Sequence, residues 1–299
     1  MDINSIIKTW FLQVRGPFLI LSVVLVLLGM ALAYQSGVIH WMHGTLLMIG
    51  VLMTHISVNL FNEYSDFKTK IDTFTHRTPF SGGSGLLQAG NTSPKAVLMT
   101  AYIMFFLSAV IGFYFIWVSG WMIAIFMIIG GLSIRFYTSH LAKWLLGEFF
   151  AGLALGTFVV LGVYYALTGY LTLNAVLISI PPGILTFLLL FLNEFPDAEA
   201  DQKGGRHHLV IHFGKKKASR IYIGAMLLVY VIILAAPFIC AIPFLVWIAL
   251  LTSPLAVKSI SIVVKHVDDT PQLIPALGMN VGVVILTDLL LAAGYFLSA

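Results

Sequence analysis

Two short acidic segments carry the residue types best suited to chemistry in this chain. Residues 62–66 read Asn-Glu-Tyr-Ser-Asp and are followed by Asp72, and residues 193–197 read Asn-Glu-Phe-Pro-Asp and are followed by Asp201. The pattern Asn-Glu-x-x-Asp therefore recurs 131 positions later in the same frame. Such a recurrence indicates an internal repeat, with one copy of the element in each half of the chain.

Helical spacing would gather the oxygens of each segment. Residues four apart share one face of a helix, so Asn193, Asp197 and Asp201 form one stripe. Asn62 and Asp66 begin a second stripe. Facing carboxylates repel unless a cation lies between them, and oxygen ligands suit Mg2+, which prefers to share its shell with phosphate oxygens. The expected ligand is a diphosphate bridged to both stripes by magnesium, although acids that are solvated or paired with nearby Lys and Arg remain an alternative.

The hydrophobic composition indicates that membrane-spanning helices position these acids. Of 299 residues, 60% are hydrophobic and 9% are charged, which excludes a soluble enzyme, a nucleic-acid-binding protein and a disordered chain. One cysteine, Cys240, excludes an intramolecular disulfide and a cysteine-ligated metal cluster. A helix needs about 20 apolar residues to cross a bilayer. Nine segments qualify: 18–35, 44–61, 95–117, 121–138, 148–168, 173–192, 221–236, 243–260 and 274–297.

The basic residues predict how these spans are oriented. With nine spans, all 16 Lys and Arg residues fall on the side of the amino terminus, and the opposite loops, near 35–43, 119–120, 168–172 and 237–243, contain none. The positive-inside rule then places the amino terminus in the cytoplasm and the carboxyl terminus on the opposite side of the membrane, expected to be the inner cell membrane. Both acidic segments follow a span on the cytoplasmic side, so we expect the active site to face the cytoplasm.

The segments 59–72 and 193–218 resemble the aspartate-rich motifs of the UbiA-type intramembrane prenyltransferases, and residues 135–138, Lys143 and 147–148 resemble a loop of that family. The resemblance covers essentially the whole chain. It implies a single domain over residues 1–299, built as an all-α, ring-like bundle of nine transmembrane helices with a central cavity and a cytoplasmic cap. It also implies transfer of a prenyl group from an isoprenyl diphosphate to an acceptor, through an allylic carbocation.

Candidate roles follow from the acids and from the resemblance together. We expect two Mg2+ ions, one held by Asn62, Asp66 and Asp72 and the other by Asn193, Asp197 and Asp201. The four aspartates are the candidate catalytic residues. The candidate diphosphate contacts are Arg77, Lys143 and Tyr137, followed by Arg15, Lys68 and Arg206.

Three positions depart from the family pattern. Glu63 stands where Asp is usual, Lys70 where Gly is common, and His140 in a loop that often carries prolines. The longer Glu63 side chain would weaken a direct metal contact, so Glu63 is left out of the metal set.

Other polar residues receive weaker assignments. Residues 81–85, which read Ser-Gly-Gly-Ser-Gly, are expected to form a mobile cap segment rather than a nucleotide loop. Asp288 falls inside the ninth span and should pair within the bundle or line the cavity. His207, His208 and His212 are expected at the membrane interface.

Residues 78–85, soon after Asp72 and Arg77, look most like the menaquinone branch of the family, which prenylates an aromatic quinone precursor such as 1,4-dihydroxy-2-naphthoate. Membrane terpene cyclases and lipid-ether prenyltransferases share the metal motifs, and a cation-coupled transporter would also carry a repeat with acids. The Asp-Gly-x-x-Ala-Arg signature of CDP-alcohol phosphatidyltransferases is absent from this sequence.

Overall fold

The computed structural model describes residues 3–38, 40–70, 77–136, 145–203 and 205–299, and every regular element in these ranges is helical. The elements are α1 (Ile3–Gln13), η1 (Gly16–Leu19), α2 (Ile20–Gln35), α3 (Trp41–Thr69), α4 (Pro94–Ser119), α5 (Met122–Phe136), α6 (Gly147–Gly152), η4 (Leu153–Thr157), α7 (Phe158–Thr168), α8 (Leu173–Lys203), α9 (Leu209–Phe213), α10 (Lys215–Ile239), η5 (Phe244–Thr252), α11 (Ser253–His266) and α12 (Thr270–Phe296).

Eight helical segments within the described ranges are long and apolar enough to cross a membrane. They coincide with eight of the nine segments expected from the sequence, and the shorter apolar helix α5 occupies the place of the remaining one, the expected fourth span. α3 and α8 run past the expected limits of 61 and 192, to Thr69 and Lys203. Both acidic segments therefore lie on the last turns of long helices, which keeps their side chains in helical register.

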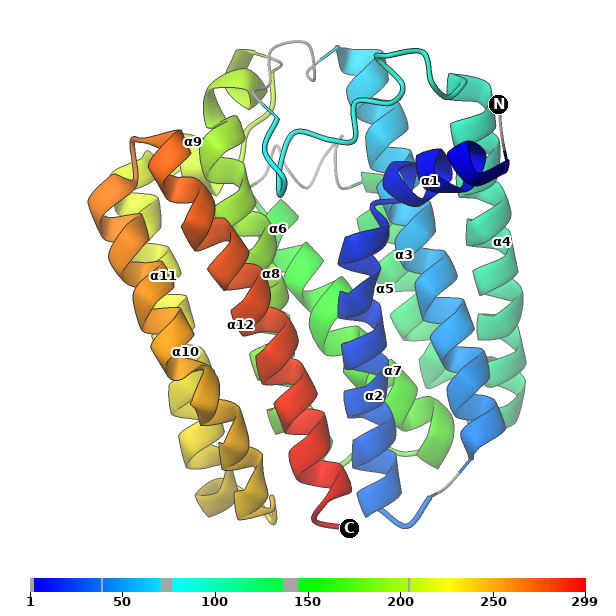
Figure 1. Ribbon diagram of the computed structural model, residues 1–299. Coiled ribbons are helices and arrows are strands. Elements are labelled where there is room, and N and C mark those ends of the chain that lie inside the picture. The colour runs from blue at the N-terminus through cyan, green and yellow to red at the C-terminus, as the bar shows by residue number, and fades with distance from the viewer. Residues whose placement is uncertain (1–2, 39, 71–76, 137–144, 204) are drawn as a thin grey trace.

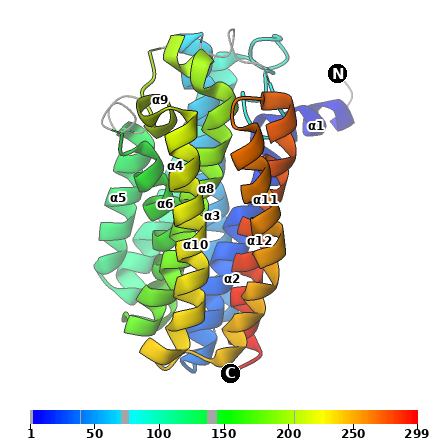
Figure 2. The same ribbon diagram turned by 90° about the vertical axis from the view of Figure 1, so that its left-hand side faces the viewer.

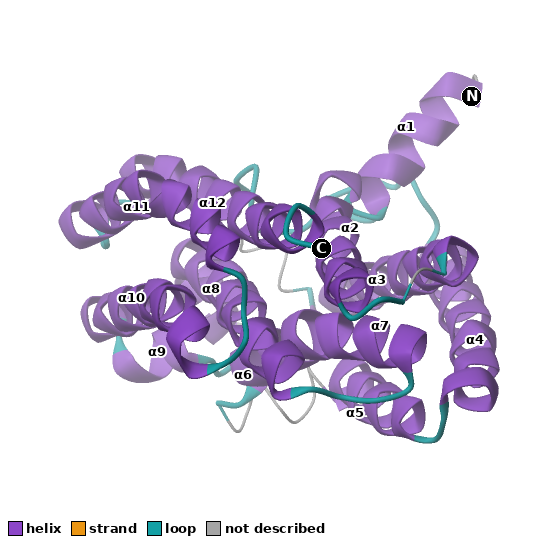
Figure 3. Ribbon diagram, turned by 90° about the horizontal axis from the view of Figure 1, so that it is seen from below, coloured by secondary structure: helices purple, strands orange, loops and turns teal. Residues whose placement is uncertain are grey.

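The long helices run roughly parallel, and the two termini lie at opposite ends of the bundle (Figure 1). α3 and α8 both finish at the end that carries the amino terminus, so the two acidic segments share that end (Figures 1 and 2). α1 lies across this end and projects away from the bundle, with Ile3, Ile7 and Phe11 exposed (Figure 3). This helix precedes the first of the nine segments expected from the sequence.

Viewed along its axis, the bundle has two unequal parts (Figure 3). Residues of α2, α3, α4, α5, η4, α7 and α8 line a cavity of about 370 Å³. α10, α11 and α12 line none of it and pack instead against α2, α8 and η5. The cavity is thus lined by helices from α2 to α8, and α10, α11 and α12 support one side of the bundle.

Small residues let two helices pack closely at one wall of the cavity. A Cβ atom added to Gly156 would lie 2.7 Å from Gly183 Cα, and one added to Gly152 would lie 2.6 Å from the Gly183 carbonyl oxygen. Membrane helices use small residues at such close crossings because packing, not hydrophobic exclusion, holds them together. η4 is a single π-helical stretch at this crossing, and Ala154 and Leu155 within it face the cavity. π-bulges of this kind are frequent at functional sites.

Hydrogen bonds link the carboxyl-terminal helices. The Tyr222 hydroxyl lies 2.9 Å from Ser259 Oγ and donates to Asn280 Oδ1 at 3.0 Å, and Asn280 Nδ2 donates to the Leu188 carbonyl at 3.1 Å. Asp288, on α12, is fully buried, but its carboxylate oxygens have no hydrogen-bond partner within the described residues and do not line the cavity. Among the described residues, Asp288 therefore neither pairs within the bundle nor lines this cavity.

Candidate active site

The two acidic segments meet through one arginine. Arg206, just beyond α8, donates from Nη2 to Asp66 Oδ1 on α3, and its Nη1 lies 3.3 Å from Asp201 Oδ1 on α8. Asp66 and Asp201 are both largely buried. Residues separated by more than 130 positions thus share one guanidinium, which balances part of the negative charge that the two helices bring together.

The second stripe has the geometry that its spacing predicts. Asn193 and Asp197 are one helical turn apart on α8, and the Oδ1 atom of each is buried without a hydrogen-bond partner in the described part of the chain. Buried oxygens of this kind are costly unless a ligand satisfies them. Asn193 also lines the upper end of the cavity, as does Asn62 on α3. The oxygens present therefore fit a hard divalent cation at the cavity mouth. Asp72 lies outside the described residues.

Glu63 has a different role from its neighbours. Its carboxylate accepts hydrogen bonds from Gln13 Nε2 at 3.0 Å, Ser84 N at 2.8 Å and Ser84 Oγ at 2.6 Å, and Arg15 Nε lies 3.3 Å from Oε1. Gln13 is completely buried and also accepts from the Thr92 hydroxyl at 2.6 Å. Glu63 therefore joins the end of α1, α3 and the following loop, and both of its oxygens are engaged.

The loop from Thr78 to Gly85 lies over the site and contacts both acidic segments. Ser84 binds Glu63, as above, and Ser81 and Gly82 lie near the Asp197 carboxylate. Gly82, Gly83 and Gly85 have φ values of 85°, 69° and 71°, a backbone conformation that glycine adopts without strain. This explains why the sequence here is rich in glycine: the loop must turn repeatedly to follow the mouth.

The predicted diphosphate contacts fall into three groups. Arg206 lies between the acidic segments, and Arg15 lines the cavity mouth. Arg77 is exposed and packs its guanidinium over Gly85, and Lys68 is exposed with Nζ 5.9 Å from the centre of the Tyr64 ring. Among the described residues, neither Arg77 nor Lys68 forms an ion pair with an acid of the two stripes. Tyr137 and Lys143 lie outside the described residues.

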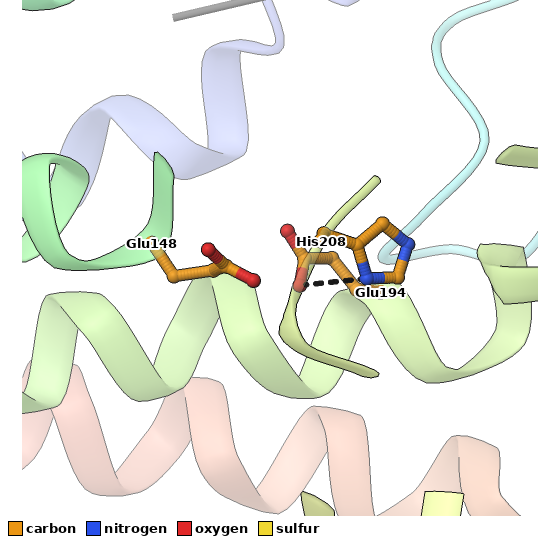
Figure 4. A group of neighbouring side chains, drawn as sticks. All are labelled: Glu148, Glu194 and His208. Atoms are coloured by element: carbon orange, nitrogen blue, oxygen red, sulfur yellow. Dashed lines mark ion pairs between the residues drawn. The ribbon is translucent and has the colours of Figure 1, made fainter. Parts of the chain in front are cut away.

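A cluster of two glutamates and one histidine was not predicted from the sequence. Glu148, at the start of α6, Glu194 and His208 place one ligand atom each within 4.8 Å of one another, a spacing that could accommodate a metal ion (Figure 4). His208 Nδ1 lies 3.4 Å from Glu194 Oε2 and Nε2 lies 3.4 Å from Asp201 Oδ2, while Glu148 Oε1 accepts from Leu209 N at 2.7 Å.

His208 was expected at the membrane interface, and the sequence did not predict that its ring would be buried. The ring is buried, because the chain turns back after α8 and inserts it between two acids. Charge along the sequence could not reveal this reversal of direction. The His208 ring lies between Asp201 and the buried Glu194, and neither ring nitrogen forms a hydrogen bond within the described residues.

Comparison with known proteins decides the family. The model of the UbiA prenyltransferase family matches residues 22–279. The chain belongs to this family. The resemblance drawn from the two acidic segments is therefore confirmed, and the enzyme is a prenyltransferase.

Individual members of the UbiA family match over most of their length. A 1,4-dihydroxy-2-naphthoate octaprenyltransferase of Bacillus subtilis is 30% identical over 220 residues, covering 73% of this chain and 70% of that protein. Its Escherichia coli counterpart is 26% identical, covering 97% and 96%. A UbiA homologue from Archaeoglobus fulgidus, solved with GPP and Mg2+, is 13% identical with a TM-score of 0.64 and covers 95% of this chain and 99% of that one, which establishes the shared fold.

Proposed function

We propose that this UbiA family member transfers a prenyl group from an isoprenyl diphosphate to an aromatic quinone precursor of the 1,4-dihydroxy-2-naphthoate type, with magnesium as cofactor. The observation that carries the proposal is the position of two acidic helix ends at the mouth of a largely apolar cavity. A charged diphosphate fits the mouth and a prenyl chain fits the cavity below. The acceptor class rests on the names of the similar proteins from Bacillus subtilis and Escherichia coli.

We assign the metal to the oxygens of the acidic stripes. Asn62 and Asp66 on α3, with Asp72, would hold one Mg2+, and the second would bind the α8 set of Asn193, Asp197 and Asp201. The unpartnered Oδ1 atoms of Asn193 and Asp197 support this assignment. When bound, magnesium supplies positive charge that stabilises the departing diphosphate. The number of magnesium ions, two, is part of this proposal.

The chain's own residues then bind, orient and protect the substrate. Arg206 and Arg15 present guanidinium groups that suit phosphate oxygens. Phe80, on the loop from Thr78 to Gly85, lines the cavity and packs against α12, which helps to exclude water from the allylic cation. The C–O bond breaks and the diphosphate leaves with its electron pair. A ring carbon of the acceptor then forms the new C–C bond to the allylic cation and loses the proton or carboxyl group that it carried, which restores the aromatic ring.

The experiment combines purified protein in lipid nanodiscs, Mg2+ and prenyl diphosphates of several lengths, with no acceptor, with 1,4-dihydroxy-2-naphthoate or with a glycerol phosphate. Pyrophosphate release and the prenylated product are measured together. Acceptor-dependent release with a matching naphthoate product supports the proposal. Release without acceptor and with a cyclised product would establish a terpene cyclase instead, and prenylation only of a glycerol phosphate would establish a lipid-ether prenyltransferase.

We further propose that the chain is a single domain of nine spans, with the amino terminus and the site facing the cytoplasm. The uneven distribution of Lys and Arg supports this orientation. Cys240 is the sole cysteine and lies after α10, at the end of the bundle away from the acidic segments. A membrane-impermeant maleimide should label it from outside intact cells. The variant Cys240→Ala with Lys217→Cys should react only after the cells are opened, and the opposite pattern would reverse the orientation.

A further inference from the structure

Glu148, Glu194 and His208 converge at one point beside the acidic stripes. They come from three elements: Glu148 lies at the start of α6, Glu194 on α8, and His208 directly before α9 (Figure 4). One ligand atom of each lies within 4.8 Å of those of the other two. The three residues are nearly inaccessible, with exposed fractions of 1%, 9% and 4%. Neither of the assigned Mg2+ sets contains any of them.

Most polar atoms of this cluster have no hydrogen-bond partner. Glu148 Oε2, Glu194 Oε2 and both ring nitrogens of His208 are buried and form no hydrogen bond within the described residues. His208 Nδ1 lies 3.4 Å from Glu194 Oε2, but the two groups are not aligned as a hydrogen bond. Buried polar atoms in this state are costly unless a ligand satisfies them. The cluster therefore points to a bound group rather than to internal pairing.

The charge of the cluster favours a cation as that group. The two glutamates place carboxylate oxygens within 4.8 Å of each other, and Asp201 brings a third carboxylate to 3.4 Å from His208 Nε2. Arg206 lies within electrostatic range of Glu194, but its guanidinium is engaged by Asp66 and Asp201. A neutral imidazole adds no positive charge, whereas one divalent cation would balance both glutamates.

The contacts around the cluster match a carboxylate–histidine–metal arrangement. Ligand atoms about 2.1 Å from one tetrahedral zinc ion lie roughly 3.4 Å apart, and His208 Nδ1 lies 3.4 Å from Glu194 Oε2. On the other side of the ring, Nε2 lies 3.4 Å from Asp201 Oδ2, a carboxylate that can hold the proton on Nε2 and leave Nδ1 free to bind metal. Glu148 Oε1 accepts from Leu209 N at 2.7 Å, which fixes that carboxylate and leaves Oε2 for the ion.

We propose that Glu148, Glu194 and His208 bind a divalent transition-metal ion of the Zn2+ type, at a site separate from the two Mg2+ sites. Imidazole nitrogen and carboxylate oxygen together suit Zn2+, whereas Mg2+ prefers oxygen ligands. The ion joins α6, α8 and the start of α9, and so holds the reversal of the chain that carries Arg206 to the acidic stripes. Its role is structural, and the inference does not depend on which acceptor the enzyme prenylates.

The matched pair His208→Gln and His212→Gln provides the test. Both replace an imidazole by an amide next to or within α9, but His208 is buried in the cluster and His212 is exposed. Full-length protein in nanodiscs is stripped with a chelator, incubated with Zn2+ in excess Mg2+, desalted and analysed for metal by mass spectrometry. Excess Mg2+ competes for the oxygen ligands of the stripes, and Asp197→Asn shows whether those stripes contribute to the bound Zn2+. In wild-type protein, Co2+ replaces Zn2+ and its visible absorption reports the coordination.

We expect wild type, His212→Gln and Asp197→Asn each to retain about one Zn2+ per chain and to gain apparent Tm when Zn2+ is added. His208→Gln should bind Zn2+ at least about 100-fold more weakly, because loss of an outer-shell partner alone costs about 10- to 100-fold. Bound Co2+ should give the intense visible bands of a four- or five-coordinate site.

Two results would overturn the assignment. If wild-type protein retains no Zn2+ and Co2+ shows only the weak bands of a six-coordinate ion, protons rather than a metal balance the cluster. If His208→Gln and His212→Gln retain equal amounts, the ion binds elsewhere. Thermal unfolding identifies a misfolded His208→Gln, in which case the cobalt spectrum of the wild type decides the outcome. Metal content is measured without substrate, so failure of the enzyme to prenylate a naphthoate would leave this test intact.

Discussion

Replacing Arg206 by alanine should destabilise the protein most when magnesium is removed. Arg206 contacts Asp66 on α3 and lies 3.3 Å from Asp201 on α8. Removal of its charge leaves these carboxylates facing each other at the junction of the two helices. Mg2+ bound to the same oxygens supplies positive charge there and should offset much of the loss.

The magnitude follows from distance and burial. Two unit charges 3.3 Å apart at an effective dielectric constant of about 20 attract by roughly 5 kcal/mol, an upper bound before desolvation. Removing one partner of a buried ion pair lowers the free energy of unfolding by about 3–5 kcal/mol. The Arg206 side chain is 25% exposed, which places the expected loss near 3 kcal/mol, or about 6 °C in apparent Tm for a chain of this size.

The assay is thermal unfolding in nanodiscs with EDTA or with Mg2+. The matched control is Arg220→Ala, which removes an exposed guanidinium from α10. Arg206→Ala should lose about 6 °C in EDTA and less than half of that with Mg2+, whereas Arg220→Ala should change little in either. Equal losses for the two variants, or a loss that Mg2+ does not reduce, would refute the account of Arg206 as the shared counter-charge.

Three further predictions test other parts of the structure. Gly156→Ala should lower the free energy of unfolding by about 1–3 kcal/mol, because the added Cβ would clash with the backbone of α8. In the control Gly224→Ala on α10, the added Cβ has no neighbour within 4 Å, so stability should be unchanged or higher. Chemical denaturation measures both. Glu63→Ala should free the loop held by Ser84, measured as faster amide hydrogen exchange over residues 78–85 while α12 is unchanged; equal exchange would contradict its anchoring role. Asp288→Asn should raise stability by about 1 kcal/mol or more, since it removes an ionisable group buried without partners, and a clear loss would show that the carboxylate is needed.

The helical positions of the acids could be predicted because they depend on local spacing. Asn193 and Asp197 lie one turn apart on α8, as their separation requires. Lys70 interrupts the first copy, and α3 ends just before it, with Lys70 in the left-handed conformation at φ 57°. α3 and α8 continue beyond the predicted span limits near 61 and 192, because backbone hydrogen bonds extend a helix through polar residues that apolar composition does not count.

Contacts between distant segments could not be predicted in the same way. Arg206 meets Asp66 across 140 positions, and Glu63 meets both Gln13 and Ser84, so these partners depend on how the helices pack. His208 is buried because the chain reverses after α8. Apolar patterning determines which residues enter the membrane, but it does not determine which polar groups face each other at the mouth.

The most direct test of the central claim compares two acids on the same helix. Asp197 lies on the ligand stripe, whereas Glu199 is exposed two residues further along α8. Mg2+-dependent prenyl transfer is measured with Asp197→Asn and Glu199→Gln in nanodiscs, with unfolding curves for both. Asp197→Asn should lower kcat by at least about 100-fold in folded protein, while Glu199→Gln should remain near wild type. Similar activities for the two variants would contradict a catalytic metal site on the α8 stripe.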